Sequence, residues 1–223
     1  MSCLLLACAL LFQQTPPSGP EVLNYVVNWP SGLSLGEARL EARQTADRSE
    51  FTLTLEAALP GFTINDHFRS LATQNNFCSL EFEKQSTHGK RKANERTAFD
   101  LQKSLATRET LAGGGKSEIP LPACPKDALT FLYYVRRELS QGRLPPAQTV
   151  FFGAAYQVRL DYGGTQNLRL GESKVEADRL LASLKGPASQ ISFEVFFARD
   201  PVRTPVLIRV PFPMGAFSME LVR

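Results

Sequence analysis

Apolar and polar residues alternate along most of this chain, with the period of two that is typical of strands with one buried face. The clearest case is the stretch Glu37–Arg43, in which every second residue is charged. As a helix, this stretch would place like charges side by side four residues apart. Glu37 would lie beside Glu41, and Arg39 beside Arg43. A strand avoids these contacts and is therefore predicted. The same alternation predicts strands within 23–29, 51–55, 80–82, 156–162, 191–197, 206–210 and 217–221.

Groups of turn-forming residues separate the predicted strands. They are Pro30–Gly32, His88–Gly89, Tyr162–Gly164, Asp200–Pro201 and Pro213–Gly215. The connections are short, whereas parallel neighbours would each need a crossover helix, so roughly ten mainly antiparallel strands are expected. The predicted fold class is all-β, either a large curved sheet or a partly open β-barrel.

One segment, residues 127–139, has helical spacing of its apolar positions instead. Asp127 stands near its start, two arginines stand in its last turn, and Gly142 follows, which is the arrangement that favours a helix between these points. This helix is expected to cover one face of the sheet or one end of the barrel.

Two shorter segments fit more than one structure. Ile64, Phe68 and Leu71 have the spacing of one helix face, which allows a short helix over Asn65–Ala72. Residues 179–185 fit either element, and we predict a strand there.

Composition and charge limit the function classes. The chain has 223 residues, of which 43% are hydrophobic and 21% charged, as in an ordinary globular protein. The net charge of +3 is too small to indicate nucleic acid as a partner. Two histidines are few for metal or acid–base chemistry. No cofactor is expected.

The first fourteen residues form an uncharged, apolar leader. Its run from Cys3 to Phe12 is too short for a membrane-spanning helix of about 20 residues and is typical of the core of a secretory signal. Leu5–Cys8 matches the lipobox of bacterial lipoproteins, in which Cys8 would be lipidated. A buried N-terminal segment of a cytosolic protein is the alternative. We expect residues 15–20 to be a linker and residues 21–223 a single, mainly β domain without a transmembrane span.

Removal of the leader leaves Cys78 and Cys124 as the cysteines of the domain. Two cysteines in an oxidising compartment usually form a disulfide, so we predict a bridge between them, with two separate buried thiols as the alternative. Neither cysteine has a second Cys or His at ligand spacing, and no metal site is expected.

Three stretches share a distinctive spacing of aromatic, proline and glycine residues: the predicted helix at 127–136, the segment 193–209, and the closing segment 215–221. They resemble a bacterial family catalogued as domain of unknown function 3108. The resemblance covers most of residues 21–223 and implies an exported, mainly β protein of the bacterial envelope. It carries over no catalytic residue. The family-motif residues, whose role is unknown, are Asp127, Tyr133, Tyr134, Arg136, Asp200 and Pro205.

One short motif raises the possibility of an enzyme. Gly32–Gly36 fits the G-x-S-x-G pattern of a nucleophile elbow, with Ser34 as nucleophile and His67 or His88 as base. The elbow requires a strand, a sharp turn and then a helix, whereas the residues that follow Ser34 alternate as a strand. We therefore favour a glycine-bounded hairpin turn.

Several other groups allow a functional and an ordinary interpretation. Lys84 and the segment His88–Arg96 form a basic hairpin, which would attract anionic headgroups or be a solvated turn. The neighbours Asp66 and His67 would be an acid–base unit or a surface pair. Four aromatic residues would line a ligand cavity or belong to the core; they are Trp29, Phe82, Phe193 and Phe197.

Taken together, these features predict a non-catalytic protein of the bacterial periplasm or outer envelope. Its partner would be an apolar or lipid-like ligand or another envelope protein, and its association with the membrane would be peripheral or through a lipid anchor. Two alternatives stay open: a serine hydrolase that uses Ser34, and a structural module that binds only protein.

Overall fold

The computed structural model describes residues 20–222, apart from positions 60, 112, 188, 213 and 214. The leader at 1–14, with Cys8, and almost all of the linker at 15–20 lie outside the described residues. Within the described part, the chain forms fifteen strands and one helix. Their bounds are β1 (Glu21–Asn28), β2 (Ser34–Gln44), β3 (Arg48–Leu59), β4 (Phe62–Thr73), β5 (Ser79–His88), β6 (Arg91–Asp100), β7 (Leu105–Thr110), β8 (Lys116–Pro120), β9 (Lys126–Asp127), α1 (Ala128–Ser140), β10 (Gln148–Phe151), β11 (Ala155–Leu170), β12 (Ser173–Lys185), β13 (Gln190–Ala198), β14 (Pro205–Phe212) and β15 (Gly215–Leu221).

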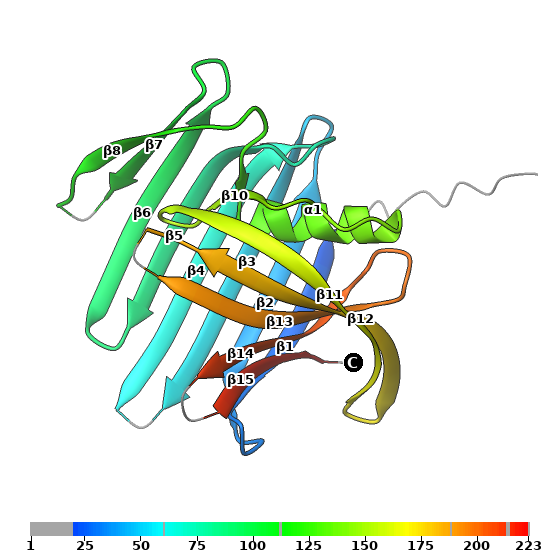
Figure 1. The fold of residues 1–223 in the computed structure, drawn as a ribbon. Helices are drawn as coiled ribbons and strands as arrows, with labels where there is room; N and C mark the ends of the chain where they lie inside the picture. Colours follow the sequence, from blue (N-terminus) through cyan, green and yellow to red (C-terminus); the bar gives the residue numbers. More distant parts are fainter. Residues whose placement is uncertain (1–19, 60, 112, 188, 213–214, 223) are drawn as a thin grey trace, which may run out of the picture.

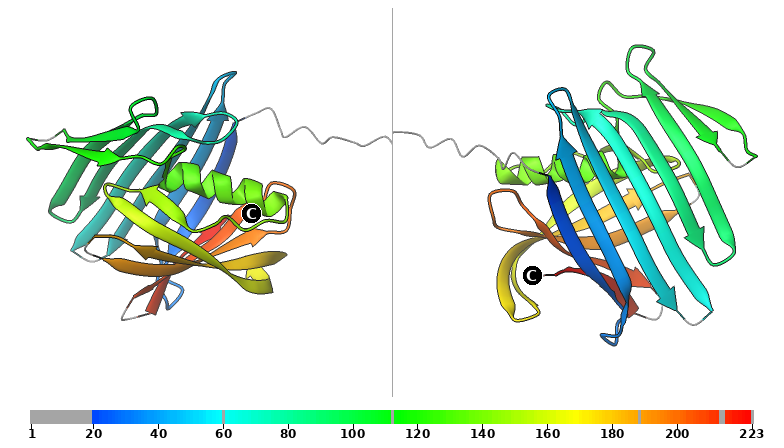
Figure 2. Two further views of the ribbon diagram at one scale, coloured as in Figure 1. Left: turned by 45° about the horizontal axis from the view of Figure 1, so that its top comes forward. Right: turned by 180° about the vertical axis from the view of Figure 1, so that it is seen from behind.

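All of these strands belong to one sheet, in the order β8-β7-β6-β5-β4-β3-β2-β1-β15-β14-β13-β12-β11-β10-β9. Neighbouring strands pair antiparallel, except β9 and β10, which are parallel. The sheet curves around α1, and the end strands β8 and β9 do not pair with each other (Figures 1 and 2). The predicted all-β, mainly antiparallel fold with a curved sheet or partly open barrel is confirmed.

Two sequence-based predictions of secondary structure were wrong. Residues 65–72 are not a helix but the middle of β4, because pairing with both β3 and β5 supplies their backbone hydrogen bonds. The expected roughly ten strands are too few, because short strands carry too little alternation to be recognised and the longer β4 and β6 were also missed. The short strands β8, β9 and β10 have only five, two and four residues. The preference for a strand at 179–185 is confirmed, because these residues lie in β12.

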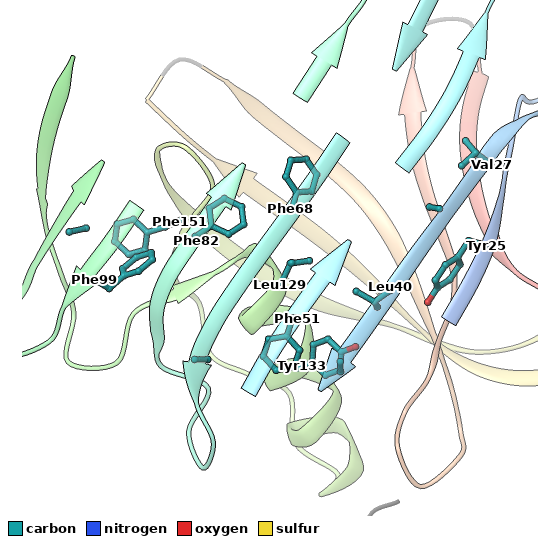
Figure 3. Close-up of a cluster of buried hydrophobic side chains, with 14 of the residues drawn as sticks. Tyr25, Val27, Leu40, Phe51, Phe68, Phe82, Phe99, Leu129, Tyr133 and Phe151 are labelled. Atoms are coloured by element: carbon teal, nitrogen blue, oxygen red, sulfur yellow. The ribbon is translucent and has the colours of Figure 1, made fainter. Parts of the chain in front are cut away.

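The helix lies on the concave side of the sheet, as expected for residues 127–139, and begins one residue later. Leu129 and Tyr133 pack against the half of the sheet that contains Phe51, whereas Phe131 and Val135 pack against β10–β13 (Figure 3 shows the first of these clusters). The helix thus fills the space between two halves of one sheet. No helix among the described residues is long and apolar enough to cross a membrane.

The predicted disulfide is present in the structure. Cys78 and Cys124 are joined, with their Cα atoms 4.8 Å apart. The bond ties the start of β5 to the segment that leads into β9 and α1, and Ser79 N donates to Pro125 O at 2.8 Å beside it. The disulfide and this hydrogen bond therefore hold the end strand β9 near β5, although β9 and β5 do not pair as neighbouring strands.

Candidate functional site

A cavity of about 120 Å³ lies between α1 and strands β10–β13. Its walls are apolar throughout, with Phe131 and Val135 on the helix side and Leu180, Phe193 and Val195 on the sheet side. Cavities of this kind stay dry, and one of roughly 150 Å³ lined by Leu, Ile and Phe is large enough for benzene. The cavity can therefore admit a small apolar group or the end of a longer chain.

The concave face of the sheet continues the apolar surface beyond the cavity. Residues paired across eight neighbouring strands form one row on this face, which we call the concave row: Leu180, Val195, Ile208, Met219, Val27, Gly36, Ala57 and Ile64. A single helix of 13 residues does not cover the whole row, and Ile64, Ile208 and Met219 remain half-buried.

Leu132 lies between the cavity and the apolar cluster of the curved sheet that contains Phe51. Its side chain lines the cavity, is half-buried, and packs against both apolar clusters of the curved sheet. Leu180 and Val195 belong both to the cavity wall and to the concave row, so the cavity and this face together form the candidate ligand site.

The concave row ends at polar side chains of β4 and β5. His88 follows Ile64 in the row, and its Nε2 lies 2.9 Å from Asp66 Oδ1. Lys84, opposite Phe68 on the same face, places its Nζ 4.7 Å from the centre of the Phe152 ring. The acid–base interpretation of Asp66 with His67 does not hold, because neighbouring residues of a strand point to opposite faces. Asp66 pairs with His88 instead.

The aromatic candidates divide between the site and the core. Phe193 and Phe197 line the cavity, as the ligand-cavity interpretation expects. Phe82 is buried beside Phe68 in the other apolar cluster, and Trp29 packs edge-on against Phe217 with ring centres 4.7 Å apart. The sequence missed Phe152, which contacts both Phe68 and Phe82 and carries no periodic signal in its turn.

Asp127, a family-motif residue, caps the helix from a fully buried position. Its carboxylate accepts hydrogen bonds from Ser70 Oγ at 2.6 Å and Ser79 Oγ at 2.7 Å, and from the backbone N–H groups of Leu129 and Thr130. Burial raises the pKa of Asp127 above its ordinary value, although these four hydrogen bonds act in the opposite direction. Its role in this structure is to fix the start of α1 against β4 and β5.

Two further motif residues, Tyr133 and Arg136, bind the other side of the helix to β1. Arg136 forms two hydrogen bonds with the carboxylate of Glu21, and the Tyr133 hydroxyl donates a third at 3.1 Å. Burial raises the pKa of Tyr133, and the negative charge of Glu21 raises it further. These residues position the helix, and their own side chains are not among those that line the cavity.

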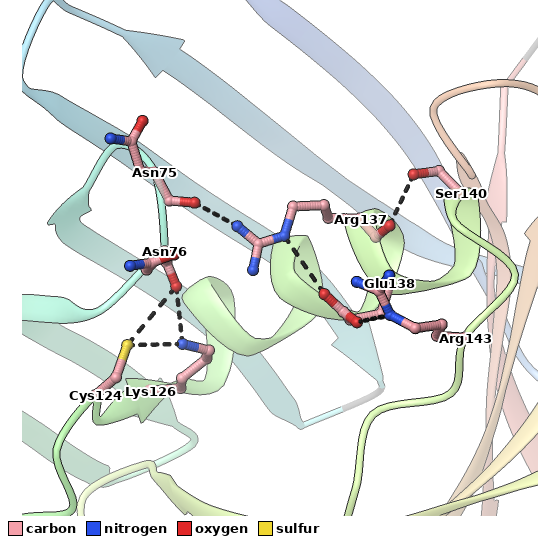
Figure 4. Close-up of polar contacts among 8 residues, drawn as sticks. All are labelled: Asn75, Asn76, Cys124, Lys126, Arg137, Glu138, Ser140 and Arg143. Carbon is pink, nitrogen blue, oxygen red and sulfur yellow. Dashed lines mark hydrogen bonds and ion pairs between the residues drawn. The ribbon is translucent and has the colours of Figure 1, made fainter.

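The remaining motif residues also have structural contacts. The Tyr134 ring lies under Lys126 Nζ at 4.7 Å. Asp200 accepts a hydrogen bond from Thr204 N at 3.0 Å, and the Pro205 carbonyl accepts one from the Tyr25 hydroxyl at 2.8 Å. Figure 4 shows the polar contacts around Lys126 and the second half of α1.

Ser34 lies in a hairpin and not in a nucleophile elbow. It is exposed, pairs with Asn28 of β1, and is followed by ten more residues of β2. Gly36 is explained by packing, because a Cβ there would lie 1.9 Å from the Glu56 carbonyl oxygen. Both glycines of the motif therefore serve the hairpin, since Gly32 has a φ of 85° in its turn.

Comparison with known proteins decides the family. The family described as protein of unknown function, DUF3108, matches residues 24–222. The chain belongs to this family. The curated proteins contain no match to this DUF3108 protein. Its fold is similar to that of the β-barrel-like protein of domain of unknown function DUF1849 from Brucella abortus, with a TM-score of 0.61. That likeness covers 92% of the DUF3108 chain and 96% of the other, at 9% sequence identity, and shows the fold alone.

Nothing in the described part of this DUF3108 protein forms a metal centre. No group of three or more His, Cys, Asp or Glu side chains is placed to hold an ion among those residues. The candidate site is therefore defined by apolar walls and by the polar side chains at the end of the concave row.

Proposed function

We propose that this DUF3108 protein is a non-catalytic protein of the bacterial cell envelope that binds an apolar, acyl-like ligand between α1 and β10–β13. The observation that carries the proposal is the cavity of about 120 Å³ with wholly apolar walls, which shares Leu180 and Val195 with the concave row. Apolar area that stays uncovered at a protein surface in water favours a ligand, because burial of that area is favourable by about 25 cal/mol per Å².

The proportions of the site favour a chain over a bulky ligand. The cavity lies below the range of about 300–1,000 Å³ that is usual for drug-sized ligands. The end of an acyl chain would occupy it, and the rest of the chain would lie along the concave row. Each methylene that leaves water contributes about 0.8 kcal/mol, so a chain gains affinity with every carbon that the concave face covers.

The envelope location rests on two features. The apolar leader at 1–14 has the length of a secretory signal core, with Cys8 as the position for a lipid anchor. The disulfide between Cys78 and Cys124 agrees with an oxidising compartment outside the cytoplasm. The protein would then associate with the membrane peripherally or through that lipid anchor. Docking onto another envelope protein would occur with or without the bound ligand.

Titration with an apolar fluorescent probe tests the ligand. N-Phenylnaphthylamine is expected to gain fluorescence with the purified domain, and dodecanol is expected to displace it. Ala182→Phe places a ring in the cavity and should abolish probe binding, because Ala182 lines the wall. Leu181→Phe, on the same strand but on the outer face and 37% exposed, is the matched control and should bind normally.

The proposal fails if the folded domain binds neither the probe nor dodecanol. It also fails if Ala182→Phe melts as a cooperative unit and binds as well as the wild type. Labelling of Ser34 by a serine-reactive phosphonate would favour the hydrolase alternative. An unliganded domain that captures only protein would favour the structural module.

A further inference from the structure

Strand β5, which borders the concave row, carries an ammonium group that forms no direct ion pair within the described part of the chain. Lys84 lies on the concave side of β5, opposite the buried Phe68, and its side chain is half-buried. Among the described residues, Lys84 forms no ion pair or hydrogen bond, and its contact is with the face of Phe152. A partly desolvated cation without an anion is unfavourable, so this position favours an anionic partner.

The nearest acid in the sheet is already engaged. Glu95 stands opposite Lys84 on β6, but its carboxylate binds Arg108, with Nη2 2.5 Å from Oε1. Asp66, one strand away, is held by His88 at 2.9 Å and is only 12% exposed. Neither carboxylate pairs directly with Lys84, and the group of Lys84, Arg108 and Glu95 keeps a net positive charge.

Aromatic rings lie next to the ammonium group of Lys84. Phe152 lies 5.2 Å from Phe68 and 5.8 Å from Phe82, centre to centre. The charged group thus stands where an apolar surface ends and polar side chains begin, which is the arrangement that a molecule with an apolar chain and an anionic head requires.

Beyond Lys84, the same face of β5 continues with hydrogen-bonding groups. Ser86 and His88 follow at every second position, each about 7 Å further along the strand. His88 uses Nε2 for Asp66, and its Nδ1 has no partner within the described chain. Ser86 offers contacts to headgroup oxygens that Lys84 does not reach.

We propose that Lys84 binds the anionic headgroup of a single-chain amphiphile whose chain runs along the concave face past Phe152 toward the cavity, where Val150 forms part of the wall. This inference rests on the proposed function and specifies its ligand class: an acyl chain with a carboxylate or phosphate group. Ser86, the next side chain on this face, supplies a further hydrogen bond to the headgroup.

Displacement of N-phenylnaphthylamine by amphiphiles of one chain length tests the inference. Dodecanoate and dodecyl phosphate are expected to bind about tenfold more tightly than dodecanol, the ratio typical of one hydrogen bond to a charged group. Dodecyltrimethylammonium should bind more weakly than dodecanol. The two anions distinguish a carboxylate from a phosphate headgroup.

Lys84→Gln should remove the higher affinity for the anions and leave the affinity for dodecanol unchanged. Lys84→Arg should retain the higher affinity for the anions. Lys92→Gln is the matched control, because Lys92 is exposed on the outer face of the same hairpin. An anion preference that survives in Lys84→Gln, or is absent from the wild type, overturns this inference while the apolar site stands. Failure of the wild type to bind either the probe or dodecanol overturns both proposals.

Discussion

Arg136 of α1 and Glu21 of β1 form a two-pronged ion pair, with Nη1 2.7 Å from Oε2 and Nη2 2.6 Å from Oε1. The guanidinium is only 5% exposed, and its Nε donates to the Val202 carbonyl at 3.1 Å. The Arg136 side chain therefore joins three segments that are distant in sequence: α1, β1 and the loop that contains Val202. Because α1 forms one wall of the proposed ligand site, this contact also fixes the width of that site.

Arg136→Met is expected to destabilise the domain by about 3 kcal/mol, because it leaves the Glu21 carboxylate partly buried without its cation. Urea unfolding measures the loss. Glu21→Gln and the double variant complete a mutant cycle, and the double variant should recover part of the stability. Additive losses in the two single variants would contradict a coupled pair.

The same pair predicts a response to acid. Burial alone would raise the pKa of Glu21, but the hydrogen bond and charge of Arg136 outweigh burial and hold the pKa below its ordinary value. The stability that this pair contributes is present above the unfolded-state pKa of Glu21 and is lost as the pH falls through its folded-state pKa. Glu21→Gln should therefore flatten the acid limb of a plot of unfolding free energy against pH. An unchanged acid limb would show that other carboxyl groups control it.

The sequence predicted local structure well and tertiary contacts poorly. Alternation at Glu37–Arg43 and helical spacing at 127–139 were enough to identify β2 and α1, since both patterns depend on near neighbours. Glu21 and Arg136 are 115 residues apart, and no local pattern links them. The sequence raised a cavity lined by Phe193 and Phe197 as one of two interpretations, but it could not decide between cavity and core, because the volume depends on how far one helix fills a curved sheet.

Asp127 was marked by the family resemblance, and the structure predicts how its replacement acts. Asp127→Ala removes the N-cap and leaves Ser70 and Ser79 hydroxyls without their acceptor, which should destabilise the domain by about 3 kcal/mol. Asp127→Asn keeps an acceptor for the backbone N–H groups and should lose less than half as much. Thermal unfolding compares the two. Equal losses would mean that the charge of Asp127, rather than its capping geometry, is what matters.

The disulfide closes a loop with a sequence separation of 46 residues, for which chain entropy predicts a stabilisation of about 4 kcal/mol. Reduction should lower the melting temperature by roughly 10 °C for a domain of this size. The control is Cys78→Ala combined with Cys124→Ala, whose melting temperature should be low and insensitive to reductant. A reductant effect that persists in this variant would contradict the assignment.

Lys126 predicts a second rise of stability with pH, in the alkaline range. Its Nζ donates to the Asn76 carbonyl at 2.9 Å beside the disulfide, and burial, with the nearby charge of Arg137, lowers its pKa from 10.5 to about 8. Above the folded-state pKa the buried amine is neutral, whereas the unfolded chain still binds the proton. Stability should therefore rise between pH values of about 8 and 10, by at most about 1.4 kcal/mol per pH unit.

Two variants isolate this effect from other groups. Lys126→Met carries no charge and Lys126→Arg cannot lose its charge, so both should show a flat unfolding free energy over the same range. Burial raises the pKa of Tyr25 and Tyr133, so the unfolded chain ionises first above a pH of about 10 and stability falls there in all three proteins. A rise that persists in Lys126→Arg would assign the alkaline stabilisation to a different group.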